Sequence, residues 1–370
     1  LDSLAIPHNS NQSNGKTFRL AYYDGRPLDQ AYAEQRMRNE PLVEITQIKG
    51  TSETHPRLSP NDEWAGFEIL NTRKGKVSFY SNPHGSYVRE ALMNGMALEK
   101  ENRGNPFKIG FIGSSDNHNS SGSYEEDNYF GTTPLTSSPL SRGSIPFNEE
   151  YLDGSVSTSQ LNGSEIVIDQ YLPGSERTAR FGASGLAGVW AEENTRESIF
   201  NALRRKETFG TSGNRIKVRF FGGFTLKDVD LNSDDLIKKA YERGVPMGAD
   251  LISEGNESPH FLVWAQRDSY GAPLQRLQII KGWYDHGPDK QTREKVYDVA
   301  CSDGLEVDPK THRCPENNAK VNLKDCSISN NGASELKTIW TDPDFESSVE
   351  SFYYVRVLEN PTCRWTTWDA

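Results

Sequence analysis

The sequence predicts an α/β domain followed by an antiparallel β-rich module. From residue 1 to about residue 119, short apolar runs alternate with helical stretches, which is typical of β/α folds. From Asn214 onward the apolar period becomes two, and turn residues separate the runs, which indicates antiparallel strands. The chain has 370 residues and is 34% hydrophobic, enough for two cores. We therefore expect domains over residues 1–213 and 214–370.

The first domain contains both kinds of element. A β/α order predicts a parallel sheet or a barrel, in which ligands gather at the carboxyl ends of the strands. The helix 86–102 is predicted from the apolar residues that recur along one of its faces. The expected strands are 1–6, 41–50 and 107–116, and the expected helices are 62–70 and 86–102.

A long segment rich in Ser, Gly and Pro, residues 120–182, interrupts this domain. Loops of this length inside a compact domain are usually lids, binding loops or disordered. Because it follows Asp116 and His118, we expect a lid over a site. Residues 183–213 then predict a strand and a helix with Asn194 or Thr195 as its N-cap.

The β-rich module is predicted from runs that alternate apolar and polar residues. Its long Cys-containing loop, between Tyr297 and Thr338, needs covalent support. The expected strands are 215–224, 260–268, 274–285 and 351–360.

The net charge of −11 and the pI near 5.3 argue against nucleic acid as a partner, because binding to phosphates requires clustered Lys and Arg. No apolar run approaches the roughly 20 residues of a transmembrane helix. The chain opens on a strand-like pattern at Leu1, without a signal pattern. We expect it to be a piece of a longer polypeptide, with an upstream fragment as a possible partner.

The four cysteines, Cys301, Cys314, Cys326 and Cys363, lie in the last quarter of the chain. None forms the close pair that zinc clusters usually contain. Widely spaced cysteines in loops favour disulfides, and hence export to the periplasm or the extracellular space. Four reduced cysteines in a cytosolic protein are the alternative. Four cysteines allow three connectivities, and the sequence does not select one.

Asp116 and His118 stand two residues apart at the end of the apolar strand 107–116. Side chains at i and i+2 of an extended chain face the same way, so both can reach one metal ion. Asn117 can supply supporting hydrogen bonds. A surface hydrogen bond between Asp116 and His118 is the alternative.

His8 likewise follows an apolar strand and enters a loop that begins with Asn9. Two such strand ends in one β/α domain favour a shared metal site of His8, Asp116 and His118, with Asn9 in a supporting position. The alternative is that His8 only caps its loop.

The segment 44–55 supplies a cation, carboxylates and an imidazole: Glu44, Lys49, Glu53 and His55. This mixture suits the binding of an anionic substrate or the orientation of a water molecule. Ion pairing among these residues is the alternative. We expect the other histidines to be structural or surface residues, and these are His84, His260, His286 and His312. Fingerprints of serine hydrolases, P-loop proteins and dinucleotide-binding proteins are absent.

Five segments together resemble the exported proteins of the domain-of-unknown-function 3604 family: residues 4–15, 43–56, 111–119, 188–213 and 279–304. That family resembles the PHP (polymerase and histidinol phosphatase) superfamily of metal-dependent hydrolases. The resemblance implies that the first domain is the C-terminal part of a distorted β/α barrel.

The resemblance also implies a site of two or three metal ions. Asp116 and His118 correspond to the late D-x-H of such sites, and His8 to the histidine before it. The early H-x-H and the bridging Glu have no counterpart here and would lie upstream of Leu1.

Two functions follow as hypotheses. The first is a metal-dependent hydrolase of phosphoester or related ester bonds, which uses Zn, Mn or Fe to activate water for attack on a small-molecule substrate. The second is an exported, non-enzymatic protein that binds a ligand or partner.

Overall fold

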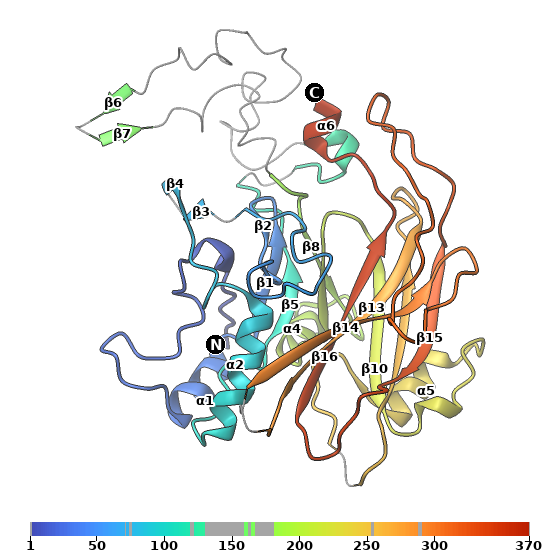
Figure 1. Cartoon of the computed structure of the whole chain (residues 1–370), viewed down its shortest axis with the longest axis horizontal. Coiled ribbons are helices and arrows are strands. Elements are labelled where there is room, and N and C mark those ends of the chain that lie inside the picture. Colours follow the sequence, from blue (N-terminus) through green and yellow to red (C-terminus); the bar gives the residue numbers. More distant parts are fainter. Residues whose placement is uncertain are drawn as a thin grey trace.

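A computed structural model describes residues 2–70, 72–73, 76–118, 122–129, 159–161, 164–166, 181–252, 255–287 and 291–369. An α/β part, blue to green in Figure 1, lies beside a β-rich part, yellow to red. The predicted lid, residues 120–182, lies mostly outside the described residues.

The amino-terminal part is built around a small mixed sheet with the order β2-β1-β5. β1 (Leu42–Gln47) and β5 (Gly110–Gly113) are parallel, and β2 (Gly50–Thr51) is antiparallel to β1. The helices α1 (Gln30–Asn39) and α2 (Val88–Lys100) share one hydrophobic core with this sheet. Buried residues of that core include Phe18, Val43, Val88, Ala91, Leu98 and Phe107. The carboxyl ends of β1 and β5 therefore meet at one edge, as expected.

Side-chain caps set the starts of two helices. The Asp29 side chain accepts a hydrogen bond from the backbone N–H of Tyr32 at the start of α1. Thr195 accepts one from the N–H of Ser198 at the start of α4 (Arg196–Arg204). Each cap satisfies a backbone donor that the first helical turn leaves unpaired. The predicted cap at Asn194 or Thr195 is thus Thr195.

The predicted β/α barrel is wrong: the described residues form several small, mainly antiparallel sheets and no closed barrel. β8 (Leu186–Val189) and β9 (Thr208–Thr211) flank α4 but pair antiparallel. The backbone N–H of Trp190, just after β8, donates to the carbonyl of Glu207, just before β9. The chain therefore passes through α4 and returns as β9 directly beside the end of β8. In a parallel crossover, the chain would instead return to the end of the sheet where β8 begins.

Two further expected elements are also absent. Residues 2–6 form no strand, and residues 62–70 form successive turns rather than a helix. The remaining short elements of this part are η1 (Ser10–Gln12), β3 (Thr72–Arg73), β4 (Lys76–Tyr80), η2 (Glu126–Asn128), β6 (Ser159–Leu161) and β7 (Ser164–Ile166).

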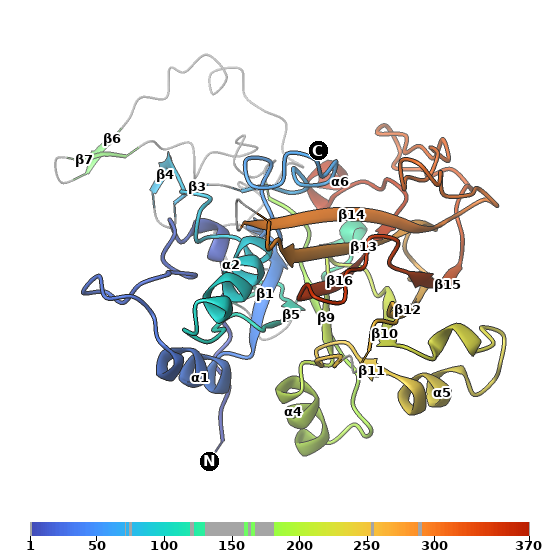
Figure 2. The ribbon, with the colours of Figure 1, turned by 60° about the horizontal axis from the view of Figure 1, so that its bottom comes forward.

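The β-rich part is a sandwich of two antiparallel sheets. The first has the order β11-β10-β12-β15, and the second has the order β14-β13-β16. Phe261, Val263, Leu277, Ile279 and Tyr297 are buried between them. Figure 2 shows β13 and β14 crossing beside α2 of the first part.

Four strands of the sandwich were expected from the period-two pattern: β10 (Lys217–Gly223), β12 (His260–Gln266), β13 (Leu274–Tyr284) and β16 (Ser351–Glu359). Three strands and two helices were not: β11 (Val245–Pro246), β14 (Thr292–Cys301), β15 (Glu335–Thr341), α5 (Leu236–Arg243) and α6 (Trp365–Asp369). η5 (Leu226–Asp228) precedes α5. The boundary at 213/214 stays a prediction.

A buried network of ions joins the two parts. Arg89 of α2 has no exposed side-chain surface, and its guanidinium donates to Glu53 and to Asp62, both at 2.7 Å. Arg356 of β16 donates to the same two carboxylates, reaching Asp62 at 2.7 Å. The hydroxyl of Tyr354 accepts from Arg89 and donates to Glu53, each at 2.7 Å. Arg89 also reaches Glu294 of β14 at 3.2 Å, so two cations from distant segments are shared by three carboxylates.

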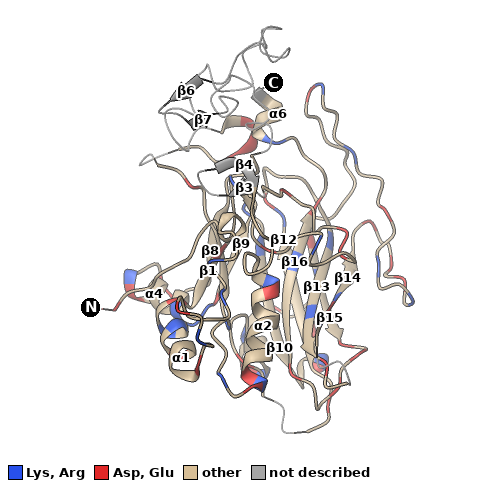
Figure 3. Ribbon diagram, turned by 60° about the vertical axis from the view of Figure 1, so that its left-hand side comes forward, with Lys and Arg blue, Asp and Glu red and all other residues tan. Residues whose placement is uncertain are grey.

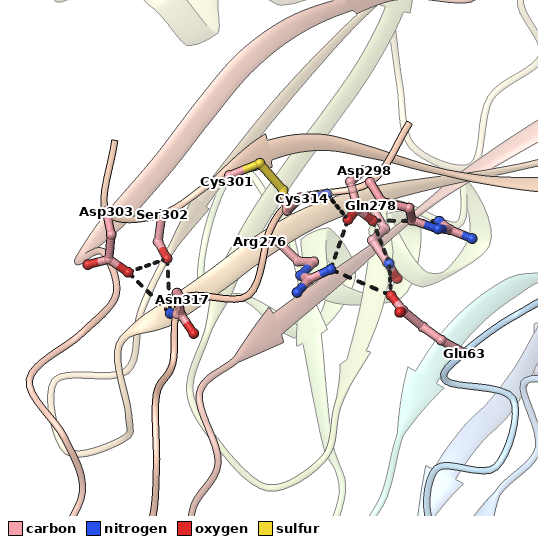
Figure 4. Close-up of a disulfide and its surroundings, with 10 residues drawn as sticks. Glu63, Arg276, Gln278, Asp298, Cys301, Ser302, Asp303, Cys314 and Asn317 are labelled. Atoms are coloured by element: carbon pink, nitrogen blue, oxygen red, sulfur yellow. Dashed lines mark hydrogen bonds and ion pairs between the residues drawn. A yellow bond between two sulfur atoms is a disulfide. The ribbon is translucent and has the colours of Figure 1, made fainter. Parts of the chain in front are cut away.

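The predicted disulfides are present, and they pair Cys301 with Cys314 and Cys326 with Cys363. Figure 4 shows the first disulfide beside Asp298, which is 2% exposed. This carboxylate accepts from the N–H of Cys314 at 2.7 Å. It therefore holds the Cys-containing loop against β14.

Charges of both signs are distributed over α1, α2 and the sandwich strands (Figure 3). No helix in the described part of the chain is long and apolar enough to cross a bilayer.

We predict that Arg356→Met destabilises the protein by about 3–5 kcal/mol, because it leaves Glu53 and Asp62 buried with one cation in place of two. Denaturant unfolding measures this. Arg293→Met is the matched control, because Arg293 pairs with Asp285 at the surface and such pairs contribute about 0–1 kcal/mol. Equal losses in the two variants would contradict the structural role of the network.

We also predict that the protein carries no alkylatable thiol under native conditions, because the described structure has no free cysteine. Removing Cys326 and Cys363 together should cost more stability than removing Cys301 and Cys314. The Cys326–Cys363 disulfide closes the longer loop, 37 residues against 13, which corresponds to a difference of about 1 kcal/mol. Mass analysis after alkylation and unfolding of both double-alanine variants test this.

Candidate functional site

Glu44 lies at the carboxyl edge of β1 and β5 and joins the segments that surround it. Glu44 is 4% exposed. Oε1 accepts from the N–H of Asn9 at 3.1 Å, and Oε2 accepts from the hydroxyl of Ser114. Ser114 in turn donates its N–H to the carbonyl of Thr46 at 3.1 Å. One buried carboxylate thus connects the loop after His8 with the loop that leads to Asp116.

Asp116 and His118 lie together at this edge, in the loop after β5, which ends at Gly113 rather than at residue 116 as expected. Nε2 of His118 is 3.5 Å from Oδ1 of Asp116, and Oδ2 of Asp116 pairs with Nζ of Lys49. The Asp116 side chain is 11% exposed and that of His118 is 59% exposed. Asp116 has a φ of 55°, a left-handed conformation that turns the chain after β5. A ligand can therefore approach the pair from the solvent.

His8 is exposed and directly precedes Asn9, so the Asn9–Glu44 hydrogen bond ties its segment to the same edge. Two buried oxygens nearby, Oδ1 of Asn9 and Oγ of Ser10, have no hydrogen-bond partner. Within the described ranges, no three His, Cys, Asp or Glu side chains are already arranged as a metal site.

These residues fit a hard or borderline divalent ion in the kinds of atom they offer. Asp116 offers a carboxylate, and His118 and His8 offer imidazoles. Asn9, the residue after His8, has an unpaired side-chain oxygen. The ammonium of Lys49 occupies one oxygen of Asp116, so an ion at that oxygen displaces it. Whether the three predicted ligands bind metal stays a prediction.

The other predicted substrate-binding residues divide between two places. Lys49 pairs with Asp116, and Glu44 accepts a hydrogen bond from Ser114, two residues before Asp116. Glu53 belongs to the buried ion network instead, where Arg356 and Arg89 lower its pKa against the opposing effect of burial. His55 is buried against Tyr87, at a ring distance of 5.3 Å, and burial together with Arg57 lowers its pKa.

Asn117 donates its N–H to the hydroxyl of Ser115 at 3.1 Å within the same loop.

The four histidines expected to be structural each contact a neighbour. His84 pairs with Glu90, His260 bonds Thr341, and His286 and His312 lie against Tyr284 and Tyr297.

A second group of ionisable residues was missed by sequence reasoning. Arg364, which precedes α6, pairs with Glu68 and with Glu126, the latter at 3.4 Å. Burial raises the pKa of Glu126 to about 7, and it also raises that of Glu359, at the end of β16, to about 7. Glu68, Glu126 and Glu359 come from distant segments, so no local spacing signals the group. A glutamate at the end of an apolar strand, as Glu359 is, was the one available cue.

The fold and this edge define a β-rich, disulfide-bonded protein with polar residues gathered at the end of a short parallel strand pair. The chain belongs to the family described as protein of unknown function (DUF3604), whose model matches residues 1–370. No curated protein matches the chain, and no solved structure does.

We predict that Glu359→Gln changes how stability depends on pH. The carboxyl of Glu359 has a pKa near 7 in the folded chain, above the 4.5 of an exposed glutamate, so the folded state holds the proton more tightly. Its contribution is present below about pH 4.5 and is lost as the pH rises through 7. Arg364, Asp268 and Arg267 also face this group.

The measurement compares the free energy of unfolding of wild type and Glu359→Gln from pH 5 to pH 8. Wild type should lose stability relative to the variant by an amount on the order of 2 kcal/mol. The subtraction removes the contributions of other titrating groups. Parallel pH profiles would show that Glu359 titrates as an exposed carboxyl does.

Proposed function

We propose that the protein is a metal-dependent hydrolase of phosphoester or related ester bonds. The observation that carries the proposal is the meeting of Asp116, His118 and Lys49 at the carboxyl edge of β1 and β5, with His8 in the segment tied there by Glu44. Carboxylate and imidazole ligands beside a lysine suit the hydrolysis of an anionic ester. The resemblance of residues 111–119 to the D-x-H segment of PHP enzymes supports the same chemistry.

In this proposal Asp116, His118 and His8 hold a divalent ion such as Zn, Mn or Fe. When bound, such an ion lowers the pKa of a water molecule and polarises the scissile bond. Lys49, displaced from Asp116, neutralises an anionic oxygen of the substrate. Glu44 keeps the two loops in register through its bonds to Asn9 and Ser114. Asn117 stays near the pair through its bond to Ser115.

We further propose that the protein is exported to the periplasm or the extracellular space, because two disulfides suit an oxidising compartment. A non-enzymatic binding function is the second candidate. A cavity between the α/β part and the sandwich, described below, is the observation that favours it.

Replacing His118 by Ala should lower the metal content of the purified protein, and it should lower hydrolysis of a generic phosphoester such as p-nitrophenyl phosphate in parallel. We expect metal affinity to fall by at least about 10-fold, the lower end of what losing even an outer-shell partner costs. The fold should persist, because His118 is mostly exposed. Elemental analysis and a pH-controlled rate assay measure both effects.

His286→Ala is the matched control, because His286 is also exposed but lies in the turn between β13 and β14. It should leave metal content and rate unchanged. Equal metal content in wild type and His118→Ala would reject the proposed site, and metal-free wild-type protein would favour the binding function.

A further inference from the structure

A cavity of about 520 Å³ lies between the α/β part and the sandwich. This volume is within the range of small-molecule sites, about 300–1,000 Å³. The apolar side chains of its walls come from five strands and a loop. They include Ile45 of β1, Phe111 of β5, Phe209 of β9, Val218 of β10, Val355 and Val357 of β16, and Trp64 and Phe67 of the loop after β2.

The two ends of the cavity differ in how their polar groups are satisfied. At one end Glu53 and Arg356 belong to the ion network, where each has several partners. At the other end Oδ1 of Asn214, Oε1 of Gln275 and Oε2 of Glu359 are buried without a hydrogen-bond partner.

An unpaired buried polar atom costs about 1–3 kcal/mol, and native structures contain few of them. Three such atoms at one end of one cavity indicate that something in the cavity satisfies them. All three are acceptors, so the occupant supplies hydrogen-bond donors.

The charges at this end favour a cation. Arg364 is shared by Glu68 and Glu126, which already offset its charge. Glu359 has no salt bridge within 4 Å among the described residues; the Asn214 side chain hydrogen-bonds its carboxyl group, and Oε2 stays unpaired. An ammonium group beside Glu359 supplies both the missing donors and the missing charge.

We propose that this cavity binds a small organic amine, with its apolar body against Phe111, Phe209 and Val355 and its ammonium group against Glu359, Asn214 and Gln275.

This site is separate from the edge that holds Asp116. The cavity is lined by Ile45 and Thr46 of β1, whereas Glu44, Lys49 and Asp116 are not among its lining residues. The inference therefore does not depend on the proposed hydrolysis, and either can fail alone.

Calorimetric titration with 2-naphthylmethylamine at pH 8, where Glu359 is ionised, tests the proposal. We expect saturable binding to wild type and about 10-fold weaker binding to Glu359→Gln, because the variant keeps the shape but loses the charged acceptor. Glu350→Gln removes the same charge just before the opposite end of β16 and should bind as wild type does.

A neutral probe separates charge from shape. 2-Naphthylmethanol should bind wild type more weakly than the amine does and should bind wild type and Glu359→Gln equally. Ile45→Trp fills the cavity and should abolish binding of both probes. The proposal is overturned if the amine fails to bind wild type, which would mean that water alone occupies the cavity, or if it binds wild type and Glu359→Gln equally.

Discussion

The buried pairing of Arg89 and Arg356 with Glu53 and Asp62 is the constraint on which the arrangement of the two parts depends. Ions taken out of water are tolerated only when each has a partner with good geometry. Here the partners come from α2, from the loop after β2 and from β16, so none of these segments can move without leaving a charge uncompensated. Arg356 lowers the pKa of Asp62, and Tyr354 adds its hydroxyl to Glu53. The network therefore determines where β16 lies against the first part, and Phe111 packs edge-on against Tyr354 at 5.4 Å as a consequence.

In this position β16 and β1 together border the cavity, which Ile45, Thr46 and residues 354–359 line. β1 also carries Glu44, which holds the loops of His8 and Asp116 and does not line the cavity. One short strand therefore borders two distinct chemical environments. One of them is polar and open to solvent, and the other is apolar with unsatisfied acceptors at one end. A hydrolytic centre and an amine site can coexist in this arrangement without sharing a side chain.

The carboxyl-terminal segment closes the acceptor end of the cavity. Cys363 is held by its disulfide to Cys326, and the next residue, Arg364, reaches Glu68 and Glu126. Trp365 donates its backbone N–H to Glu126 and its indole N–H to the carbonyl of Gly182. A covalent bond in the long loop thus positions charges that act at a site far from that loop in sequence. This connection relates the Cys326–Cys363 disulfide to the cavity as well as to stability.

The sequence by itself determined the elements whose signal is local. The parallel pair β1 and β5, the Thr195 cap, α2 and four sandwich strands follow from apolar period and capping chemistry. The i, i+2 argument for Asp116 and His118 assumed an extended strand, whereas β5 ends at Gly113 and a left-handed Asp116 brings the two side chains together in the loop that follows. The cysteine spacing predicted two disulfides but not their pairing, since loop closure alone does not rank the connectivities. Only the tertiary structure decided that β8 and β9 run antiparallel and that no barrel closes, because one backbone bond from Trp190 to Glu207 returns the chain. It also decided that Glu53 serves the ion network and that Glu359 faces a cavity, because their partners are far away in sequence and burial, rather than spacing, selects them.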